Sequence, residues 1–516
     1  MVPVVPTVCR PAGLTLADQL IGQMATRALW FVSSRGPRSL LLVSIAATAL
    51  CAPAADRAWL AGDSHIHSHW SSGYDRSRVP PTPLKGQDAA YSTPRNAAMA
   101  HQFGLRWMVT TDHGGPNHAK LNLDQAHREL TLSRELVPGV LQFYGMELNM
   151  PGMDHHTLIV PNAEDEAAIL YEIEGQFDAN EDWALPPNPW RRSESARIAA
   201  LTHLRTLARL PLLFANHPSR SATAIGVYGL DEPREFRANH DLAPEVYQGM
   251  SGAPGHQAAT LAPDGGRRPV RSGQRPNARG GYRNPDAPTL GGFDQMTAIV
   301  GGLWDSLLGE GRRFWIVAGS DSHFHYTDPV RQGSDFWPGE FHKTYVLARP
   351  TYEDVLDGLR SGRIFASAGG LITSLDVTVD GGAQQAGIGG TLAVAAGSSI
   401  EVKIQFTDPD EANAGGDDPT VRRVDLIVGE VRGPAVEPDL DRNPTTQVIA
   451  RFGPDDWVRD GDRFTVTTVL PATDVPRYLR VRGTSTTDLE PLPDGPGENP
   501  WRDLWFYSNP TFIEIE

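Results

Sequence analysis

Apolar runs alternate with helical patterns over residues 57–365. Short continuous apolar runs are typical of strands buried on both faces, and the stretches between them repeat with a helical period. Strand-then-helix alternation predicts parallel strands in a barrel or a doubly wound sheet. There are seven strand candidates: "WLAGDSHIH", "LRWMVTTDH", "VLQFYGMELN", "HHTLIVP", "LPLLFANHP", "APEVYQGM" and "RFWIVAGSDSH". The helix candidates include "PRNAAMAHQFG", "NLDQAHRELTLSREL", "SESARIAALTHLRTLARL" and, at residues 351–362, "TYEDVLDGLRSG".

The pattern changes near residue 369. From there to residue 516, stretches such as "SLDVTVDG" and "SIEVKIQF" alternate apolar and polar positions, which is typical of half-buried antiparallel strands. We therefore predict a β-sandwich over residues 369–516 after an α/β domain over 56–368. The last histidine is His342, so histidine chemistry belongs to the first domain. Residues 252–292 are rich in Gly, Pro and Arg and predict a long loop, which either meets an anionic substrate or is solvated.

The first 55 residues resemble an export signal. The apolar run "SLLLVSIAATAL" follows Arg35 and Arg38 and precedes the small residues of "CAPAA". This run is too short to span a bilayer well, so we predict a cleaved leader and an exported protein, periplasmic or secreted, without a membrane span. Cleavage would also remove Cys9 and Cys51, which are the only cysteines.

The chain is acidic, with a formal net charge of -16. Without residues 1–55, which hold four arginines and one aspartate, 46 - 4 = 42 basic and 62 - 1 = 61 acidic residues remain, a net charge of -19. Phosphate binding along a nucleic acid needs a basic surface, so this balance argues against a nucleic-acid partner. It does not exclude a small anionic substrate, because a metal cluster can outweigh the global charge locally.

Polar side chains cluster where the strand candidates end. In parallel α/β barrels these ends form the active-site face, so six of the seven candidates would direct such groups into one mouth. The groups at the strand ends are His65, His67, Asp112, His113, Glu147, His155, His156, His217, Asp321 and His323. Imidazole and carboxylate without thiolate favour Zn, Mn or Fe(II). So many candidates predict two or three divalent ions, with Glu147 able to bridge two of them, and paired ions are typical of hydrolysis.

The ordered motifs "HIH", "TTDH", "GME", "HHTLIV", "NHP" and "GSDSH" resemble those of the PHP (polymerase and histidinol phosphatase) family. The resemblance covers about residues 60–365, and the following β-domain resembles that of exported two-domain members. It implies a distorted (β/α)7 barrel with a two- or three-metal centre that usually hydrolyses phosphate esters. Carried over, His65, His67, Glu147 and Asp321 hold one ion. Glu147, His156 (or His155) and His217 hold a second, and His113 and His323 contribute to a third.

The sequence departs from the family at one ligand. The family places an Asp or His five or six residues after the second histidine of "HxH", but Ser72 and Gly73 stand there. Asp75 or His69 could replace that ligand, or the centre could be binuclear.

The sequence thus predicts a metal-dependent phosphodiesterase that hydrolyses small organophosphate diesters through a metal-bridging hydroxide. We expect Asp321, His217 and His323 to serve the reaction, and Arg220 either to hold a phosphate oxygen or to be a surface arginine. The alternatives are a PHP-like carbamate or carboxylester hydrolase and a non-catalytic metal-bearing binding or surface module.

Overall fold

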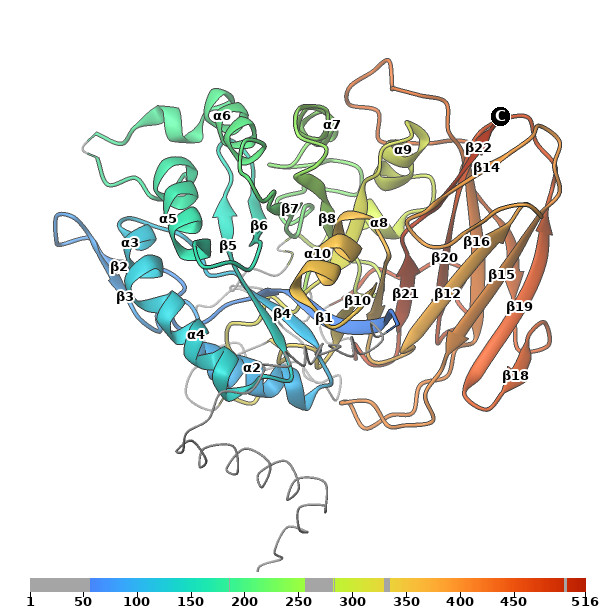
Figure 1. Ribbon diagram of the computed structural model, residues 1–516, viewed down its shortest axis with the longest axis horizontal. Helices are drawn as coiled ribbons and strands as arrows, with labels where there is room; N and C mark the ends of the chain where they lie inside the picture. The colour runs from blue at the N-terminus through green and yellow to red at the C-terminus, as the bar shows by residue number, and fades with distance from the viewer. Residues whose placement is uncertain (1–55, 185, 256–281, 283, 329–334, 496–498) are drawn as a thin grey trace, which may run out of the picture. The chain divides into compact units, whose positions relative to one another are not determined.

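The fold is built on a large mixed sheet, shown in the computed structural model of Figure 1. The predicted leader and the greater part of the predicted loop 252–292 (256–281 and 283) lie outside the described residues. No helix within the described ranges is long and apolar enough to cross a membrane. The structure describes residues 56–184, 186–255, 282, 284–328, 335–495 and 499–516.

Seven strands of this sheet correspond to the seven predicted runs, and they lie side by side in the order β1-β4-β5-β6-β7-β8-β9. Their bounds are Ala58–Ile66 (β1), Trp107–Thr110 (β4), Leu141–Asn149 (β5), His155–Val160 (β6), Leu212–Ala215 (β7), Tyr247–Ala253 (β8) and Trp315–Ala318 (β9). A small hairpin of β2 (Gly73–Asp75) and β3 (Thr82–Leu84) follows β1.

The prediction of uniformly parallel strands is wrong at β6. Strand β6 pairs antiparallel with both β5 and β7, whereas β1-β4-β5 and β7-β8-β9 pair in parallel. The connection from Asn149 to His155 is too short for the crossover that a parallel partner requires, so the chain turns back as a hairpin. This reversal puts the first residues of β6 beside the last residues of β5 and β7.

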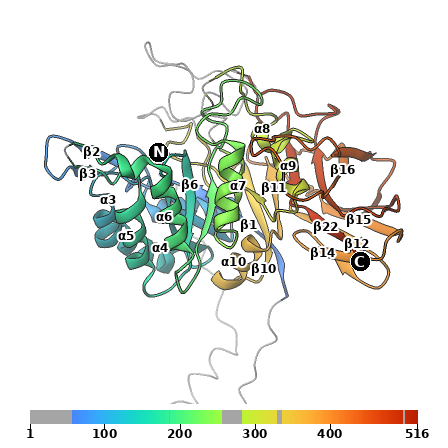
Figure 2. The same ribbon diagram turned by 90° about the horizontal axis from the view of Figure 1, so that it is seen from above.

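Helices cover one face of these strands, as Figures 1 and 2 show. Thr351 caps the predicted last helix, α10, by accepting a hydrogen bond from the Asp354 N–H at 3.2 Å. The helices are α2 (Thr93–Gln102), α3 (His118–Leu121), α4 (His127–Leu136), α5 (Glu166–Phe177), α6 (Glu194–Leu204), α7 (Pro233–Leu242), α8 (Gln295–Ala298), α9 (Leu303–Gly309) and α10 (Tyr352–Arg360). A π-helical turn, η1 (Asn122–Ala126), joins α3 to α4, and a short 3-10 turn, η2 (Pro189–Arg192), precedes α6.

The core between strands and helices is apolar and closely packed. Strands β4, β7 and β9 are buried at every position, as their continuous apolar runs predict. Gly62 on β1 faces the ring of Trp107, and a Cβ there would lie 1.9 Å from a ring carbon. A glycine is therefore required for the approach of β1 to β4.

Backbone hydrogen bonds also join β1 to the segment that follows β9. The His67 N–H donates to the Ser322 carbonyl at 3.1 Å, and the Asp321 N–H donates to the His65 carbonyl at 2.8 Å. The first and last of the seven strands are thus in contact at the ends that carry the predicted ligands.

The sheet continues from β1 into the C-terminal part of the chain. Strand β10 (His342–Ala348) pairs with β1, β11 (Ile364–Ala368) pairs with β10, and β21 (Trp505–Ser508) pairs with β11. Strands on both sides of the predicted boundary at residue 368 therefore share one sheet. The further members are β14 (Thr391–Val394), β16 (Arg423–Glu430), β17 (Gln447–Phe452), β20 (Arg477–Thr484) and β22 (Thr511–Ile515).

A separate antiparallel sheet completes the C-terminal part, in the order β13-β12-β15-β19-β18. Burial alternates along β12 and β15, which confirms the predicted period of two. The C-terminal strands are therefore divided between this sheet and the large one, and all pair antiparallel except β14 with β22, which pair in parallel. The bounds are Ser374–Asp380 (β12), Gln385–Ala386 (β13), Ile400–Thr407 (β15), Val458–Asp460 (β18) and Arg463–Leu470 (β19).

Candidate metal centre

Most of the predicted ligands lie together where β1, β4, β5, β6, β7 and β9 meet. Asp63 helps to hold this arrangement, because its carboxylate accepts hydrogen bonds from the backbone of both His65 and Ser320, each at 3.0 Å. Three overlapping groups of His, Asp and Glu side chains offer ligand atoms close enough to hold a metal ion. They are His65, His67, Glu147 and Asp321; His113, Glu147 and His155; and His67, Asp88, His113 and His323.

The first group is buried, with side chains between 0% and 3% exposed. The Nε2 atoms of His65 and His67 lie 3.0 Å apart, and they lie 3.2 and 3.1 Å from Asp321 Oδ1. Glu147 completes the group, with oxygens 3.4 Å from His65 Nε2 and 3.3 Å from His67 Nε2.

These separations fit ligands of one ion. Four ligands at about 2.0–2.1 Å from a tetrahedral ion lie about 3.3–3.4 Å from one another, and octahedral neighbours lie somewhat closer. A hydrogen bond between His65 and His67 accounts for only one of the short contacts among these atoms. A divalent cation accounts for all of them at once, so the donor set fits a metal.

Around the same carboxylate lies the second group. Glu147 Oε1 is 2.9 Å from His217 Nε2 and 3.2 Å from His155 Nδ1, and Glu147 Oε2 is 3.0 Å from His113 Nδ1. Asn216 donates a hydrogen bond from Nδ2 to Glu147 Oε1 at 3.0 Å, which fixes the carboxylate between the two groups.

The third group contains a residue that the sequence did not single out. Asp88 Oδ2 lies 3.4 Å from His323 Nε2 and 3.9 Å from His113 Nε2. Backbone hydrogen bonds hold its segment in place: Gly86 N–H donates to the His69 carbonyl at 2.7 Å, and Ala90 N–H donates to the His323 carbonyl at 3.2 Å. The only signal in the sequence for a further ligand was that Ser72 stands where the family resemblance leads us to expect an Asp or His.

Several ligand atoms lack ordinary partners. Glu147 Oε2, His155 Nδ1 and His217 Nδ1 are buried and have no hydrogen-bond partner among the described residues. Such groups are costly to bury, and a bound cation would satisfy an imidazole or carboxylate lone pair. His217 and Asp321 also have positive φ angles of 32° and 51°, a conformation that non-glycine residues adopt rarely and that concentrates at functional sites.

The electrostatics of the centre fit a cation as well. Burial opposes the ionisation of His113, but the carboxylates of Glu147 and Asp88 raise its pKa to about 9. Burial and the nearby Arg220 lower the pKa of His217 to about 4, so this imidazole is neutral and able to bind a metal at pH 7. The surrounding histidines outweigh burial and hold the pKa of Glu147 well below its ordinary value. The carboxylates therefore remain ionised and attract positive charge.

Besides His217, which contacts Glu147, and His156, three predicted ligands lie outside these groups. Asp75 is on the β2–β3 hairpin, where its carboxylate accepts hydrogen bonds from the Ser77 N–H at 2.9 Å and from the Ser77 hydroxyl at 2.6 Å. His69 Nε2 lies 2.9 Å from Glu129 of α4. Asp112 is buried but accepts hydrogen bonds from Ser68, at 2.5 Å from N–H and 2.7 Å from Oγ. Asp112 thus anchors the turn after β1.

The histidine pair at the start of β6 divides between the two faces of the strand. His155 points to Glu147, whereas His156 points into the fold, with Nδ1 3.1 Å from the Asp154 carbonyl and Nε2 3.1 Å from Tyr247 Oη. Adjacent strand residues face opposite sides, so only one of the two can reach the centre. The structure therefore places the alternative, His155, and not His156 beside Glu147.

Arg220 lies beside the centre. Its guanidinium forms an ion pair with Asp154, the residue before His155, and its side chain is 21% exposed. It is close enough to influence the pKa of His217. Arg220 is therefore a partly covered side chain at the rim of the centre, already paired with one carboxylate.

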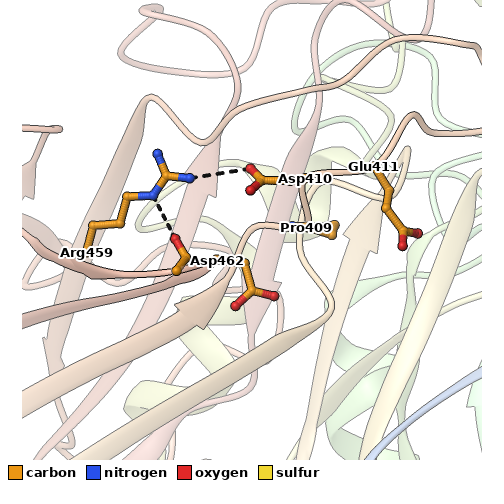
Figure 3. Close-up of a pocket in the computed structure, with 6 residues that line it drawn as sticks. Pro409, Asp410, Glu411, Arg459 and Asp462 are labelled. Atoms are coloured by element: carbon orange, nitrogen blue, oxygen red, sulfur yellow. Dashed lines mark hydrogen bonds and ion pairs between the residues drawn. The ribbon is translucent and has the colours of Figure 1, made fainter.

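A hollow on the C-terminal strands, shown in Figure 3, contains none of these residues. It is lined by Pro409, Asp410, Glu411, Arg459, Gly461 and Asp462, and Arg459 lies 3.4 Å from Asp410. Arg459 pairs with Asp410 and also donates to the Gly461 carbonyl at 2.7 Å. We find no chemistry there comparable with the metal centre.

No protein-family model matches the sequence, and no curated protein matches it significantly. The geometry of the centre therefore carries the functional argument.

Proposed function

We propose that the protein is a metal-dependent phosphoesterase of the PHP type that hydrolyses phosphodiesters at a three-ion centre. The observation that carries this proposal is the set of three overlapping ligand groups, joined through Glu147, His67 and His113. The order of the seven strands and the backbone bonds between β1 and the segment after β9 support a distorted (β/α)7 barrel around them.

Each ion would have its own ligands. His65, His67, Glu147 and Asp321 would hold the first, and His113, Asp88 and His323 would hold the third. Glu147 would bridge to a second ion held by His155 and His217. The His323 ring supports its role as a ligand, because Nδ1 lies 2.9 Å from the Asp321 carbonyl. Donation from Nδ1–H there makes Nε2, which lies 3.4 Å from Asp88 Oδ2, the atom that would bind an ion.

Exposure indicates the side from which a substrate arrives. The side chains of the first group are at most 3% exposed, whereas those of His113 and His155 are 20% exposed and that of Asp88 is 30% exposed. Arg220 lies on this open side, with 21% of its side chain exposed. We infer that the scissile group binds against the second and third ligand groups, within reach of Arg220.

The ions, when bound, would activate a water molecule and neutralise charge that develops on the substrate oxygens. The chain itself orients the substrate. Asp154 holds the Arg220 guanidinium, whose remaining N–H groups can donate to a phosphoryl oxygen. The low pKa of His217 keeps its ring neutral, so it acts as a ligand and not as a proton donor.

The charge of Arg220 favours a diester over a monoester. Asp154 already neutralises much of this guanidinium, and one partly neutralised cation suits a monoanion better than a dianion. The same pairing favours a second candidate substrate class, an uncharged carbamate or carboxylester, which needs no free cation at all. Substrate charge therefore separates the two candidates.

The test compares four substrates on the purified protein loaded with Mn²⁺ or Zn²⁺. These are bis(p-nitrophenyl) phosphate, p-nitrophenyl phosphate, p-nitrophenyl acetate and a p-nitrophenyl carbamate. We expect the diester to react fastest, activity to disappear with a chelator, and elemental analysis to find three ions per chain. Turnover confined to the monoester or to the carbonyl substrates would overturn the diesterase proposal. Bound metal without any turnover would favour a non-catalytic binding module.

Arg220→Met sharpens the test. A hydrogen bond to a charged group contributes about 1.5–3 kcal/mol, so KM for the diester should rise about 10- to 100-fold. The KM for p-nitrophenyl acetate should not change. Arg205→Met is the matched control, because Arg205 is an exposed arginine paired with Glu245.

A further inference from the structure

The Ser71 hydroxyl is fully buried and lies between the first and third ligand groups. Its Oγ lies 2.6 Å from Asp88 Oδ2, 3.1 Å from His67 Nδ1 and 3.1 Å from the His113 backbone nitrogen. Ser71 is not itself in any of the three groups. It nevertheless contacts three residues that belong to these groups, namely His67, Asp88 and His113.

Counting donors and acceptors fixes the direction of every bond. A serine hydroxyl has one hydrogen to donate and two lone pairs that accept. The ionised carboxylate of Asp88 can only accept, so the single Ser71 hydrogen goes to Asp88. The lone pairs of Oγ then accept the His113 backbone N–H and the ring hydrogen of His67. The hydroxyl therefore uses its full hydrogen-bonding capacity.

This arrangement determines the tautomer of His67. Because Ser71 has no hydrogen left for this ring, His67 must carry its own hydrogen on Nδ1. Nε2 then holds the free lone pair, and this is the atom that lies 3.1 Å from Asp321 and 3.3 Å from Glu147. A partner that holds the hydrogen on the outer nitrogen of a ligand histidine orients the ring and strengthens its binding to a metal.

Asp88 depends on Ser71 more strongly than His67 does. The Asp88 side chain is 30% exposed, and the hydrogen bond that it accepts from Ser71 is short, at 2.6 Å, whereas His323 Nε2 lies farther away, at 3.4 Å. His67 is also held by its buried strand end and by stacking on His323, with ring centroids 3.9 Å apart. Loss of the hydroxyl should therefore weaken the third group first.

We propose that Ser71 is a positioning residue that couples the third metal position to the first. It does so by donating to Asp88 while accepting from His67 and His113. This inference rests on the three-ion centre proposed above. It goes further by assigning to one hydroxyl the task of holding ligands of two ions.

The experiment compares wild type, Ser71→Ala and Ser72→Ala. Ser72 is a matched control, because its Oγ is buried without a hydrogen-bond partner among the described residues. Metal-free samples are titrated with Zn²⁺ at buffered free concentrations and then with Co²⁺, whose absorption reports each coordination sphere. We expect Ser71→Ala to weaken binding of the third ion about 10- to 100-fold and to change its Co²⁺ spectrum, with the first two ions unchanged. Ser72→Ala should behave as wild type.

Equal binding of three ions by Ser71→Ala and Ser72→Ala would overturn the inference. A wild-type protein that binds no Zn²⁺ would instead overturn the metal centre. Asp88→Asn supplies a second measurement through a double-mutant cycle of kcat/KM. If Ser71 acts through Asp88, Ser71→Ala should cost much less in the Asp88→Asn background. Full additivity of the two effects would contradict the coupling.

Discussion

Two buried clusters of charged side chains differ in how their polar atoms are satisfied. Between the α/β part and the C-terminal strands, Asp305 of α9 and Arg480 of β20 form a fully buried pair at 2.9 and 2.7 Å. Each Asp305 oxygen also accepts a second hydrogen bond, one from Tyr478 at 3.0 Å and one from the Gly301 N–H at 2.7 Å. In the metal centre, ligand atoms of Glu147, His155 and His217 have no hydrogen-bond partner among the described residues.

The difference separates a structural role from a functional one. The Asp305–Arg480 pair balances its two charges within the protein, although Arg480 Nη1 has no hydrogen-bond partner among the described residues. The centre collects imidazole lone pairs and carboxylates around shared points, some of them without hydrogen-bond partners, and a cation would satisfy several at once, on a backbone with positive φ at His217 and Asp321. Burial of charge alone therefore does not identify a site, whereas the convergence of several ligand atoms within reach of one ion does.

His67→Ala should have the largest effect on the functional side of this comparison. Metal ions contribute several kcal/mol to such reactions, and each 1.36 kcal/mol is a factor of ten, so kcat/KM for the diester should fall at least about 1000-fold. Elemental analysis should find fewer ions per chain. Retained activity at wild-type metal content would show that the unsatisfied cluster is not the catalytic centre.

On the structural side, Asp305→Ala should have the largest effect. Removal of one partner leaves Arg480 charged in a buried site, which costs about 3–5 kcal/mol of unfolding free energy, measurable by urea denaturation. The metal content and kcat/KM of the folded protein should not change. Asp439→Ala is the control, because Asp439 pairs with Arg234 on the surface and its loss should matter little. Equal effects of the two variants would contradict the distinction.

The sequence predicted what depends on local pattern. The seven strands, the helix after residue 351 and the period of two in β12 and β15 follow from hydrophobic periodicity. His65, His67, Glu147 and Asp321 were predicted because each stands at the end of an apolar run. Strand ends are fixed by the same pattern that fixes the strands.

The features that the sequence could not predict depend on the direction of a strand and on contacts between residues far apart in the chain. The reversal of β6 follows from the length of one turn, and it decides that His155 and not His156 faces Glu147. Asp88 is in a loop, where no periodicity marks it. Backbone bonds to His69 and His323 bring it to the centre, and Asp75, which stands nearer in sequence, is turned away on its hairpin.

A second buried ion pair, close to the metal centre, tests what separates the two clusters. Either the hydrogen bonding of their polar atoms decides their role, or the part of the molecule in which they lie decides it. His118 is fully buried, with Nδ1 2.6 Å from Glu174 and Nε2 2.8 Å from the Trp70 carbonyl. Both ring nitrogens thus have acceptors, as in a charged imidazolium. Burial alone would lower the pKa of His118, but Glu174 raises it to about 9.

This pair should behave as the Asp305–Arg480 pair does, although it lies in the α/β part. The folded-state pKa of His118 is above the unfolded value of about 6.5, so its stabilisation is complete below pH 6.5 and is lost as pH rises to 9. The loss should reach about 3 kcal/mol in wild type, measured by urea denaturation of the metal-free protein at several pH values. His118→Gln should remove the His118 share of this pH dependence and leave that of His113, whose pKa is also raised to about 9, whereas His101→Gln, at an exposed helix position, should retain the whole. A wild-type stability that does not fall between pH 6.5 and 9 would show that His118 is neutral in the folded protein. His118 would then resemble the neutral histidines of the metal centre, which lack a complete set of hydrogen-bond partners.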